Sequence, residues 1–245
     1  MTWRGRMGAR LAACIVWLAG ALAAAGAAAQ SSAERGHGRL FPPEDLALLE
    51  SPDRDAWQKP DLIMDALRIA DGSVVADLGA GGGWFTVRLA RRVGPNGLVY
   101  AEDIQPQMIE AIERRVAREG LRNVRTVQGT PTDPRLPPGR LDAVLIVDTY
   151  NELEDPVALL RNVARALKPR GLVGIVEFRK DGGGPGPEPE ERVDEARVVR
   201  EAEAAGLVLV RRETFLRYQY LLVFAKAAPE GTSGARTSRR PQRPR

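Results

Sequence analysis

Residues 74–86, V-V-A-D-L-G-A-G-G-G-W-F-T, join a short apolar run to a helical pattern through a loop made largely of glycine. The apolar run, residues 74–76, is mostly β-branched and is typical of a central strand in a parallel sheet. Helical periodicity follows over residues 84–93. Between them, glycines let the backbone turn sharply and approach a ligand with no Cβ in the way. The stretch therefore predicts a strand, a ligand-binding loop and a helix.

Two classes of nucleoside cofactor bind to such a unit, and the residues beside the glycines distinguish them. A dinucleotide fingerprint requires a third glycine where this chain has Trp84. The carboxylate of Asp77 would repel a pyrophosphate but suits a ligand that carries an ammonium and a sulfonium. S-adenosylmethionine is such a ligand. We therefore expect it to contact Asp77 and the loop residues Gly79, Ala80, Gly81 and Gly83.

These residues resemble the first motif of the class I S-adenosylmethionine-dependent methyltransferases, a strand that ends in an acid followed by G-x-G. Three later stretches are similar to further motifs of that family in the same order. They are residues 99–104, V-Y-A-E-D-I, residues 141–151, L-D-A-V-L-I-V-D-T-Y-N, and residues 167–178, L-K-P-R-G-L-V-G-I-V-E-F. The resemblance implies a doubly wound, Rossmann-like α/β fold with seven strands, mostly parallel, and an antiparallel last strand.

In the second motif, Asp103 takes the place of the acid that accepts hydrogen bonds from the ribose hydroxyls, with Ile104 beside it. A carboxylate suits a diol because it offers only acceptors. Asp103 could also cap the helix expected after Pro106, and both roles can hold together. Glu102 should point to the opposite side, because side chains alternate along a strand.

The adenine end of the site is less clearly marked. The family usually places an acid or amide after the third strand, but no acid directly follows Gly129 here. Gly129 and Thr130 are the residues that the resemblance implies for this contact. Asp133 is a weaker candidate, because two prolines restrict its reach.

At the end of the fourth strand, the resemblance implies that Asp148 contacts the cofactor and that Tyr150 and Asn151 position the methyl acceptor. Similar chains often carry a histidine after the tyrosine, whereas Asn151 cannot serve as a base near neutral pH. The lack of a base at this position does not exclude methyl transfer, because an in-line displacement depends largely on positioning and desolvation. Alternatively, Asn151 caps the next helix and Asp148 caps or pairs locally.

The two ends of the chain differ from its middle. Residues 1–29 are typical of a cleaved signal peptide, because three arginines precede an apolar run that ends in A-A-A. We therefore expect an exported, periplasmic protein, with an uncleaved N-terminal membrane anchor as the alternative. If the signal is cleaved, no stable membrane span remains. Residues 30–58 form a leader, residues 59–228 the methyltransferase domain, and residues 229–245 a basic tail that we expect to be disordered.

The basic overall charge of +4 comes from these ends, because residues 30–228 hold 28 basic and 31 acidic residues. Nothing in that composition resembles a nucleic-acid surface, and no protein partner is predicted. The single histidine, His37, lacks a second histidine or a cysteine nearby, which argues against a metal site or a hydrolase triad.

Strand and helix patterns alternate along the domain. Helices are expected at 61–69, 84–93, 106–119, 154–167 and 193–205, and strands at 73–78, 98–103, 123–128, 141–148, 171–178, 207–215 and 218–225. Two further segments could shape an acceptor pocket. Trp57 in the leader either covers the site or packs against a helix, and the glycine-rich loop 179–191 is either a mobile lid or a flexible excursion.

The sequence favours a methyltransferase that moves a methyl group from S-adenosylmethionine to a small-molecule or lipid-like acceptor. The alternative is a non-catalytic, exported ligand-binding protein on the same fold. It is motivated by a conflict within the chain, because this cofactor is made in the cytosol while the N-terminal segment predicts export.

Overall fold

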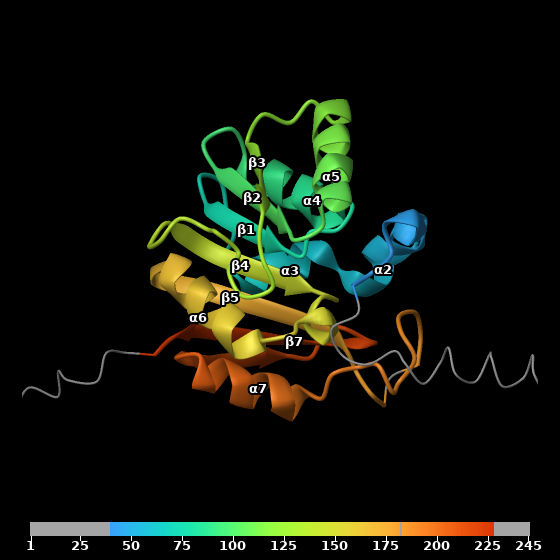
Figure 1. Cartoon of the computed structure of the whole chain (residues 1–245), viewed down its shortest axis with the longest axis vertical. Coiled ribbons are helices and arrows are strands. Elements are labelled where there is room, and N and C mark those ends of the chain that lie inside the picture. The colour runs from blue at the N-terminus through green and yellow to red at the C-terminus, as the bar shows by residue number, and fades with distance from the viewer. Residues whose placement is uncertain (1–39, 182, 228–245) are drawn as a thin grey trace, which may run out of the picture.

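The strands of this computed structural model, which describes residues 40–181 and 183–227, form one seven-stranded sheet in the order β3-β2-β1-β4-β5-β7-β6 (Figure 1). Strands β1 to β5 run parallel to one another, whereas β7 runs antiparallel to both β5 and β6. The predicted fold class is therefore confirmed. The strands are β1 Val74–Leu78, β2 Leu98–Asp103, β3 Val124–Gln128, β4 Leu141–Val147, β5 Leu167–Phe178, β6 Leu207–Glu213 and β7 Gln219–Lys226.

Helices cover both faces of this sheet, which explains why its central strands are almost entirely apolar. On one face, α3 (Pro60–Ala66) and α4 (Trp84–Val93) bury Ile63, Phe85 and Leu89 against it. On the other face, α6 (Pro156–Ala166) and α7 (Glu195–Ala204) bury apolar side chains against the sheet and form a second hydrophobic core (Figure 1). Helix α5 (Pro106–Arg118) packs against β2 and β3. The strand order reverses between β1 and β4, where open α/β sheets bind their ligands.

The predicted elements agree with the structure except near some of their ends. Helix α3 stops at Ala66, three residues early, and α7 begins at Glu195 because the Asp194 carboxylate accepts the Ala196 N–H. The expectations for residues 1–29, His37 and the tail 229–245 lie outside the described residues. Within residues 40–181 and 183–227, no helix is both long and apolar enough to cross a membrane.

The leader before the sheet folds into two short helices, η1 (Pro43–Leu49) and α2 (Arg54–Gln58). Trp57 lies on α2, with its ring centroid 5.9 Å from that of Phe178 and 6.4 Å from that of Tyr218. Aromatic rings at these separations attract one another in addition to burying apolar area. Trp57 therefore fastens the leader to the ends of β5 and β7.

The glycine-rich loop after β5 packs against the same aromatic rings. A Cβ at Gly184 would overlap the ring of Tyr218, and one at Gly186 would overlap that of Phe178. Both glycines also have positive φ, at 87° and 102°, which other residues rarely adopt. The guanidinium of Arg192 lies 5.3 Å from the centre of the Phe178 ring. The described part of this loop is thus a packed extension of the sheet.

We predict that Trp57→Ala loosens the leader more than the domain. The substitution removes the contacts with two aromatic rings, and losing a half-buried side chain of this size costs about 1–2 kcal/mol. Thermal unfolding should shift down by a few degrees, and limited proteolysis should cut the leader faster than in the parent protein. Leu48→Ala is the control, since Leu48 lies in the same leader but is 74% exposed. Equal effects of the two substitutions would contradict the role of Trp57.

Candidate cofactor site

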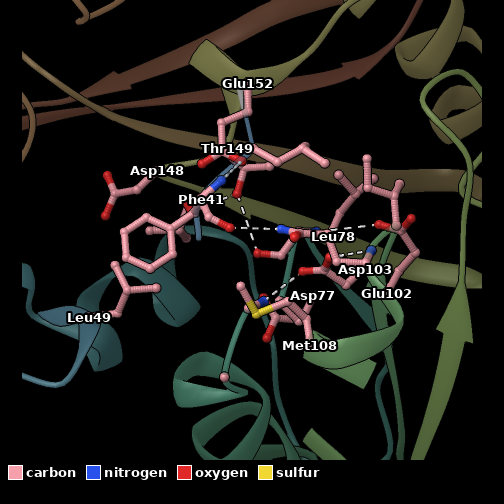
Figure 2. A pocket seen from close by; sticks show the side chains of 18 of the residues that line it. Phe41, Leu49, Asp77, Leu78, Glu102, Asp103, Met108, Asp148, Thr149 and Glu152 are labelled. Carbon is pink, nitrogen blue, oxygen red and sulfur yellow. Dashed lines mark hydrogen bonds between the residues drawn. The ribbon is translucent and has the colours of Figure 1, made fainter. Parts of the chain in front are cut away.

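A pocket of about 1120 Å³, part of it open to solvent, lies at the carboxyl ends of β1, β2 and β4 (Figure 2). Its walls come mainly from five parts of the chain: the leader, the glycine loop, the loop after β2, the loop after β3 and the segment after β4. None of the described residues of the loop between β5 and α7, which includes residues 179–191, lines this pocket.

The glycine loop follows β1 directly and forms one wall. Gly79, Gly81 and Gly83 have φ of 67°, 53° and 78°, in the left-handed region that glycine tolerates. A Cβ at Gly79 would overlap the Thr149 side chain, so this glycine lets two strand ends meet. Gly79, Ala80, Gly81 and Gly82 line the pocket, whereas Gly83 is turned toward α5. The sequence predicted that Gly83 contacts the cofactor, but Gly82 lines the cavity and Gly83 does not.

Asp77 lies at the base of the pocket with only 3% of its surface exposed. Its Oδ2 accepts a hydrogen bond of 2.6 Å from the hydroxyl of Thr86 on α4. Burial raises the pKa of Asp77 to about 6, and the Thr86 hydrogen bonds oppose that rise. Near neutral pH, Asp77 therefore presents a negative charge that a cationic ligand group can compensate.

Asp103 ends β2 and connects two loops. Its Oδ2 accepts the Gly81 N–H at 3.0 Å, and its Oδ1 accepts the Gln105 N–H at 2.9 Å. The second bond supports the turn into α5, although the N-cap position itself is Gln105. Ile104 lines the pocket beside it. Asp103 is thus a rigidly held acceptor at the rim of the glycine loop.

Glu102 also lines the pocket, which corrects the expectation that only Asp103 would face it. Its Oε2 accepts the Gly79 N–H at 3.3 Å, and the residue is 2% exposed. Its Oε1 has no hydrogen-bond partner among the described residues. Burial, followed by repulsion from Asp103, raises the pKa of Glu102 to about 8. The carboxyl is therefore mostly protonated at neutral pH.

The loop after β3 contacts Glu102 through Gly129 and lines the cavity through Thr130. A Cβ at Gly129 would overlap Glu102 Oε1, so Gly129 makes room for that carboxyl and does not line the pocket. Thr130 does line it. Asp133 is turned away, because its Oδ1 accepts the Arg135 N–H and its carbonyl accepts the Thr130 N–H. Of the three residues considered for the adenine end, Thr130 alone faces the pocket.

Asp148 follows β4 with a φ of 53°, an uncommon value for a residue with a side chain. Its carboxylate accepts hydrogen bonds from Gln58 at 3.2 Å and from Gln219 at 2.6 Å, and it lies 3.8 Å from Arg54. Burial raises the pKa of Asp148 to about 6, and Arg54 opposes this shift. Asp148 lines the pocket and also joins the leader to β7.

Tyr150 and Asn151 do not line the pocket, which corrects their predicted role in positioning an acceptor. Tyr150 is 2% exposed in the core beneath α6 and α7, and its hydroxyl donates to Glu201 at 2.8 Å. Its backbone N–H donates to the buried carboxyl of Glu177 on β5 at 2.6 Å. The unusual backbone of Asp148 ends the strand alternation, and Tyr150 therefore enters the core.

Arg54 is a pocket residue that sequence reasoning missed. It is 8% exposed, donates to Gln58 at 2.5 Å and to the Leu49 carbonyl at 2.6 Å, and lies 4.4 Å from the centre of the Trp84 ring. Burial lowers the pKa of Arg54, while Asp148 and Asp77 oppose that change. No local motif marks Arg54. Its only signal is its place in the leader, three residues before Trp57.

The chemistry of the walls fits a cationic nucleoside better than a pyrophosphate. Asp77, Asp103 and Asp148 border the cavity, and Arg54 is the only lysine or arginine among its described lining residues. Trp84 occupies the first turn of α4, where a dinucleotide fold needs close access to the helix, and the guanidinium groups of Arg54 and Arg88 lie against its ring. No cluster of three potential metal ligands occurs among residues 40–181 and 183–227. These residues could hold the ribose and the methionine portion of S-adenosylmethionine.

We predict that Glu102→Gln changes how stability depends on pH. The folded carboxyl keeps its proton up to about pH 8, whereas the ordinary pKa is 4.5, so the unfolded chain loses this proton first. The parent protein should therefore lose stability as pH rises from about 4.5 to about 8. Urea unfolding at pH 5, 7 and 8.5 should show the variant gaining stability relative to the parent over that interval. Glu110→Gln, at an exposed ion pair, is the control. An identical pH dependence of parent and Glu102→Gln would contradict the protonated state.

Comparison with known proteins agrees with this geometry. Residues 75–171 match the family described as a methyltransferase domain. A demethylmenaquinone methyltransferase of Geobacillus stearothermophilus is 29% identical over 49% of this chain and 51% of its own length. A ubiquinone/menaquinone biosynthesis C-methyltransferase of Pasteurella multocida is 35% identical over 51% of this chain and 46% of its own length. The chain thus spans about half the length of the curated relatives it matches.

A solved structure is similar over more of the chain. The S-adenosylmethionine-dependent methyltransferase of Aquifex aeolicus is 28% identical, with a TM-score of 0.73, over 77% of this chain and 100% of that one. The chain is therefore similar to a methyltransferase domain over residues 75–171 and shares the fold of this S-adenosylmethionine-dependent methyltransferase.

Proposed function

We propose that this protein transfers a methyl group from S-adenosylmethionine to a small-molecule or lipid-like acceptor. The observation that carries the proposal is the contact of the glycine loop with two acids of β2. The Gly81 N–H donates to Asp103 and the Gly79 N–H donates to Glu102, within one pocket. This arrangement presents a carboxylate at the place where the family holds the ribose hydroxyls. Two curated relatives named as quinone-pathway methyltransferases support an acceptor of this kind.

The residues of the pocket have separable tasks in this proposal. Asp103 accepts hydrogen bonds from the ribose hydroxyls, and Ile104 and Thr130 contact the base. Asp77 and the backbone of Gly79, Ala80 and Gly81 hold the methionine portion. The cofactor supplies an electrophilic methyl carbon on a positively charged sulfur. The acids of the walls compensate that charge while the leader excludes water.

We predict that Asp103→Ala weakens binding of S-adenosylhomocysteine by about 10- to 100-fold. Each hydrogen bond to a charged group contributes about 1.5–3 kcal/mol, and the variant loses those to the ribose. Isothermal titration calorimetry with the purified full chain measures the effect. Asp133→Ala is the matched control, because that acid lies in the neighbouring loop and does not line the pocket.

Two results would contradict this proposal. Absence of binding to the parent protein at high micromolar S-adenosylhomocysteine would argue against the cofactor. Parent-like affinity of Asp103→Ala would remove Asp103 from the ribose site. If binding is present but no acceptor from the native compartment is methylated, the non-catalytic binding protein becomes the better account.

We further propose that the protein is exported, on the basis of the arginines and the apolar run in residues 1–29. Mass spectrometry of the protein from its native cells tests this proposal. We expect a mature chain that begins at Gln30, and an intact N-terminus in the cytosolic fraction would contradict it. The same spectrum under native conditions would report any nucleoside that stays bound.

A further inference from the structure

We propose that Glu152 is the general base of the transfer, a catalytic residue that takes the proton the acceptor loses when it receives the methyl group. This inference rests on the proposed function. It replaces the acceptor-side roles expected for Tyr150 and Asn151, whose side chains do not line the pocket.

The position of Glu152 carries the argument. It ends the short helix η2 (Tyr150–Glu152), which directly follows the carboxyl end of β4 and its pocket residues Asp148 and Thr149. Glu152 is half-buried and lines the pocket. Figure 2 shows it beside Thr149 and close to Phe41, on the side of the cavity formed by β4 and the leader. A proton acceptor in the wall of the pocket can reach a bound acceptor molecule directly.

The pocket is lined by several other acids. Glu50 forms an ion pair with Arg115, and Glu154 is exposed. The three aspartates accept hydrogen bonds from other residues of the protein. Asp77 accepts hydrogen bonds from both the hydroxyl and the backbone N–H of Thr86. Asp103 accepts two backbone N–H groups, and Asp148 accepts two glutamine side chains. Glu102 is buried and holds its own proton at neutral pH.

The side chain of Glu152 accepts one hydrogen bond within the described residues, from the Phe41 N–H to Oε2 at 3.1 Å. Oε1 of Glu152 therefore remains available to a ligand.

The leader fixes the orientation of this carboxyl. The Phe41 N–H donates to Glu152, while the Phe41 carbonyl accepts a 3.0 Å hydrogen bond from the Gln105 side chain at the opposite rim. The backbone of Phe41 thus bridges the loops after β2 and β4 across the pocket. A carboxyl held on one oxygen by such a bridge keeps its second oxygen in a defined direction.

The electrostatic surroundings suit a base that works near neutral pH. Burial raises the pKa of Glu152 to about 7, repulsion from Asp103 and Asp148 adds to the rise, and the Phe41 N–H opposes it. The buried carboxyl of Glu177 on β5 also interacts with Glu152. A carboxylate with this pKa is a stronger base than an ordinary glutamate and is ionised in a useful fraction at pH 7.

The step is balanced without an additional reactant. The nucleophilic oxygen or carbon of the acceptor forms a bond to the methyl carbon as the bond between methyl and sulfur breaks. The electron pair of the broken bond remains on sulfur, which becomes a neutral thioether. The proton of the acceptor moves to Glu152, which releases it to water. An acceptor with an acidic O–H or C–H, such as a hydroquinone, fits this chemistry.

The first test compares Glu152→Gln with the parent chain and with Glu203→Gln, an exposed residue of α7 with the same change of charge. Calorimetry measures the affinity for S-adenosylmethionine and for S-adenosylhomocysteine at pH 6 and pH 8. The ratio of the two affinities is the preference for the charged ligand. In the parent and the control, this preference should grow by about threefold or more as Glu152 ionises beside the sulfonium. In Glu152→Gln it should grow markedly less, while affinity for S-adenosylhomocysteine stays within about threefold of the parent.

The second measurement follows methyl transfer to 1,4-naphthohydroquinone as a probe acceptor. We expect kcat of Glu152→Gln to fall by about 100-fold or more, within the range of general-base contributions, and kcat/KM of the parent to rise with pH along a limb near pH 7. Thermal unfolding of the variant establishes that it is folded. If the probe is not methylated by the parent, the binding comparison alone decides.

The proposal is overturned if Glu152→Gln keeps the pH-dependent preference of the parent or methylates the probe at the parent rate. Failure of the proposed function looks different, because the parent itself would then bind neither S-adenosylmethionine nor S-adenosylhomocysteine.

Discussion

The contact between the glycine loop and the ends of β2 and β4 is the constraint on which the site depends. Gly79 lies so close to Thr149 that a side chain there would collide with it, and its N–H donates to Glu102. Gly81 makes the equivalent bond to Asp103. Three strand ends therefore meet with fixed spacing. Any substitution that pushes this loop away from β4 also disturbs Asp103, the acid that we propose as the ribose contact.

A second constraint is the number of buried acids around one cavity. Glu102, Asp148, Glu152 and Glu177 all have raised pKa values because burial disfavours their charged forms. The protein compensates part of this cost with backbone N–H groups, glutamine side chains and the buried guanidinium of Arg54. The remaining negative potential favours a ligand that brings its own positive charge.

The leader is an integral part of the pocket. Arg54 pairs with Asp148, the Phe41 backbone bridges Glu152 and Gln105, and Trp57 fastens the segment to the sheet. The Arg115 side chain of α5 also pairs with Glu50 in the leader. The leader, which precedes the sheet in sequence, thus forms one wall of the cavity at the ends of the strands.

The fold and the glycine loop could be predicted from the sequence because their signals are local. Asp77, the glycines and Asp103 lie within two consecutive strand-loop-helix units, so their relative positions follow from the fold. Long-range partners were not predictable in this way. Gln58 and Asp148 are 90 residues apart, and nothing in either local pattern indicates that they meet.

Strand alternation did not predict which side chains line the pocket at two strand ends. At the carboxyl end of β2, Glu102 and Asp103 both line it. The positive φ of Asp148 changes the direction of the chain, so Tyr150 enters the core and Glu152 takes the pocket position. Such a backbone conformation depends on tertiary contacts and leaves no mark in the sequence.

Native mass spectrometry of the full chain with equal concentrations of S-adenosylmethionine and NADH tests the central claim most directly. The acids of the pocket, and Trp84 in the first turn of α4, predict one bound S-adenosylmethionine per chain and no bound dinucleotide. A complex with NADH, or no complex with either ligand, would contradict the account.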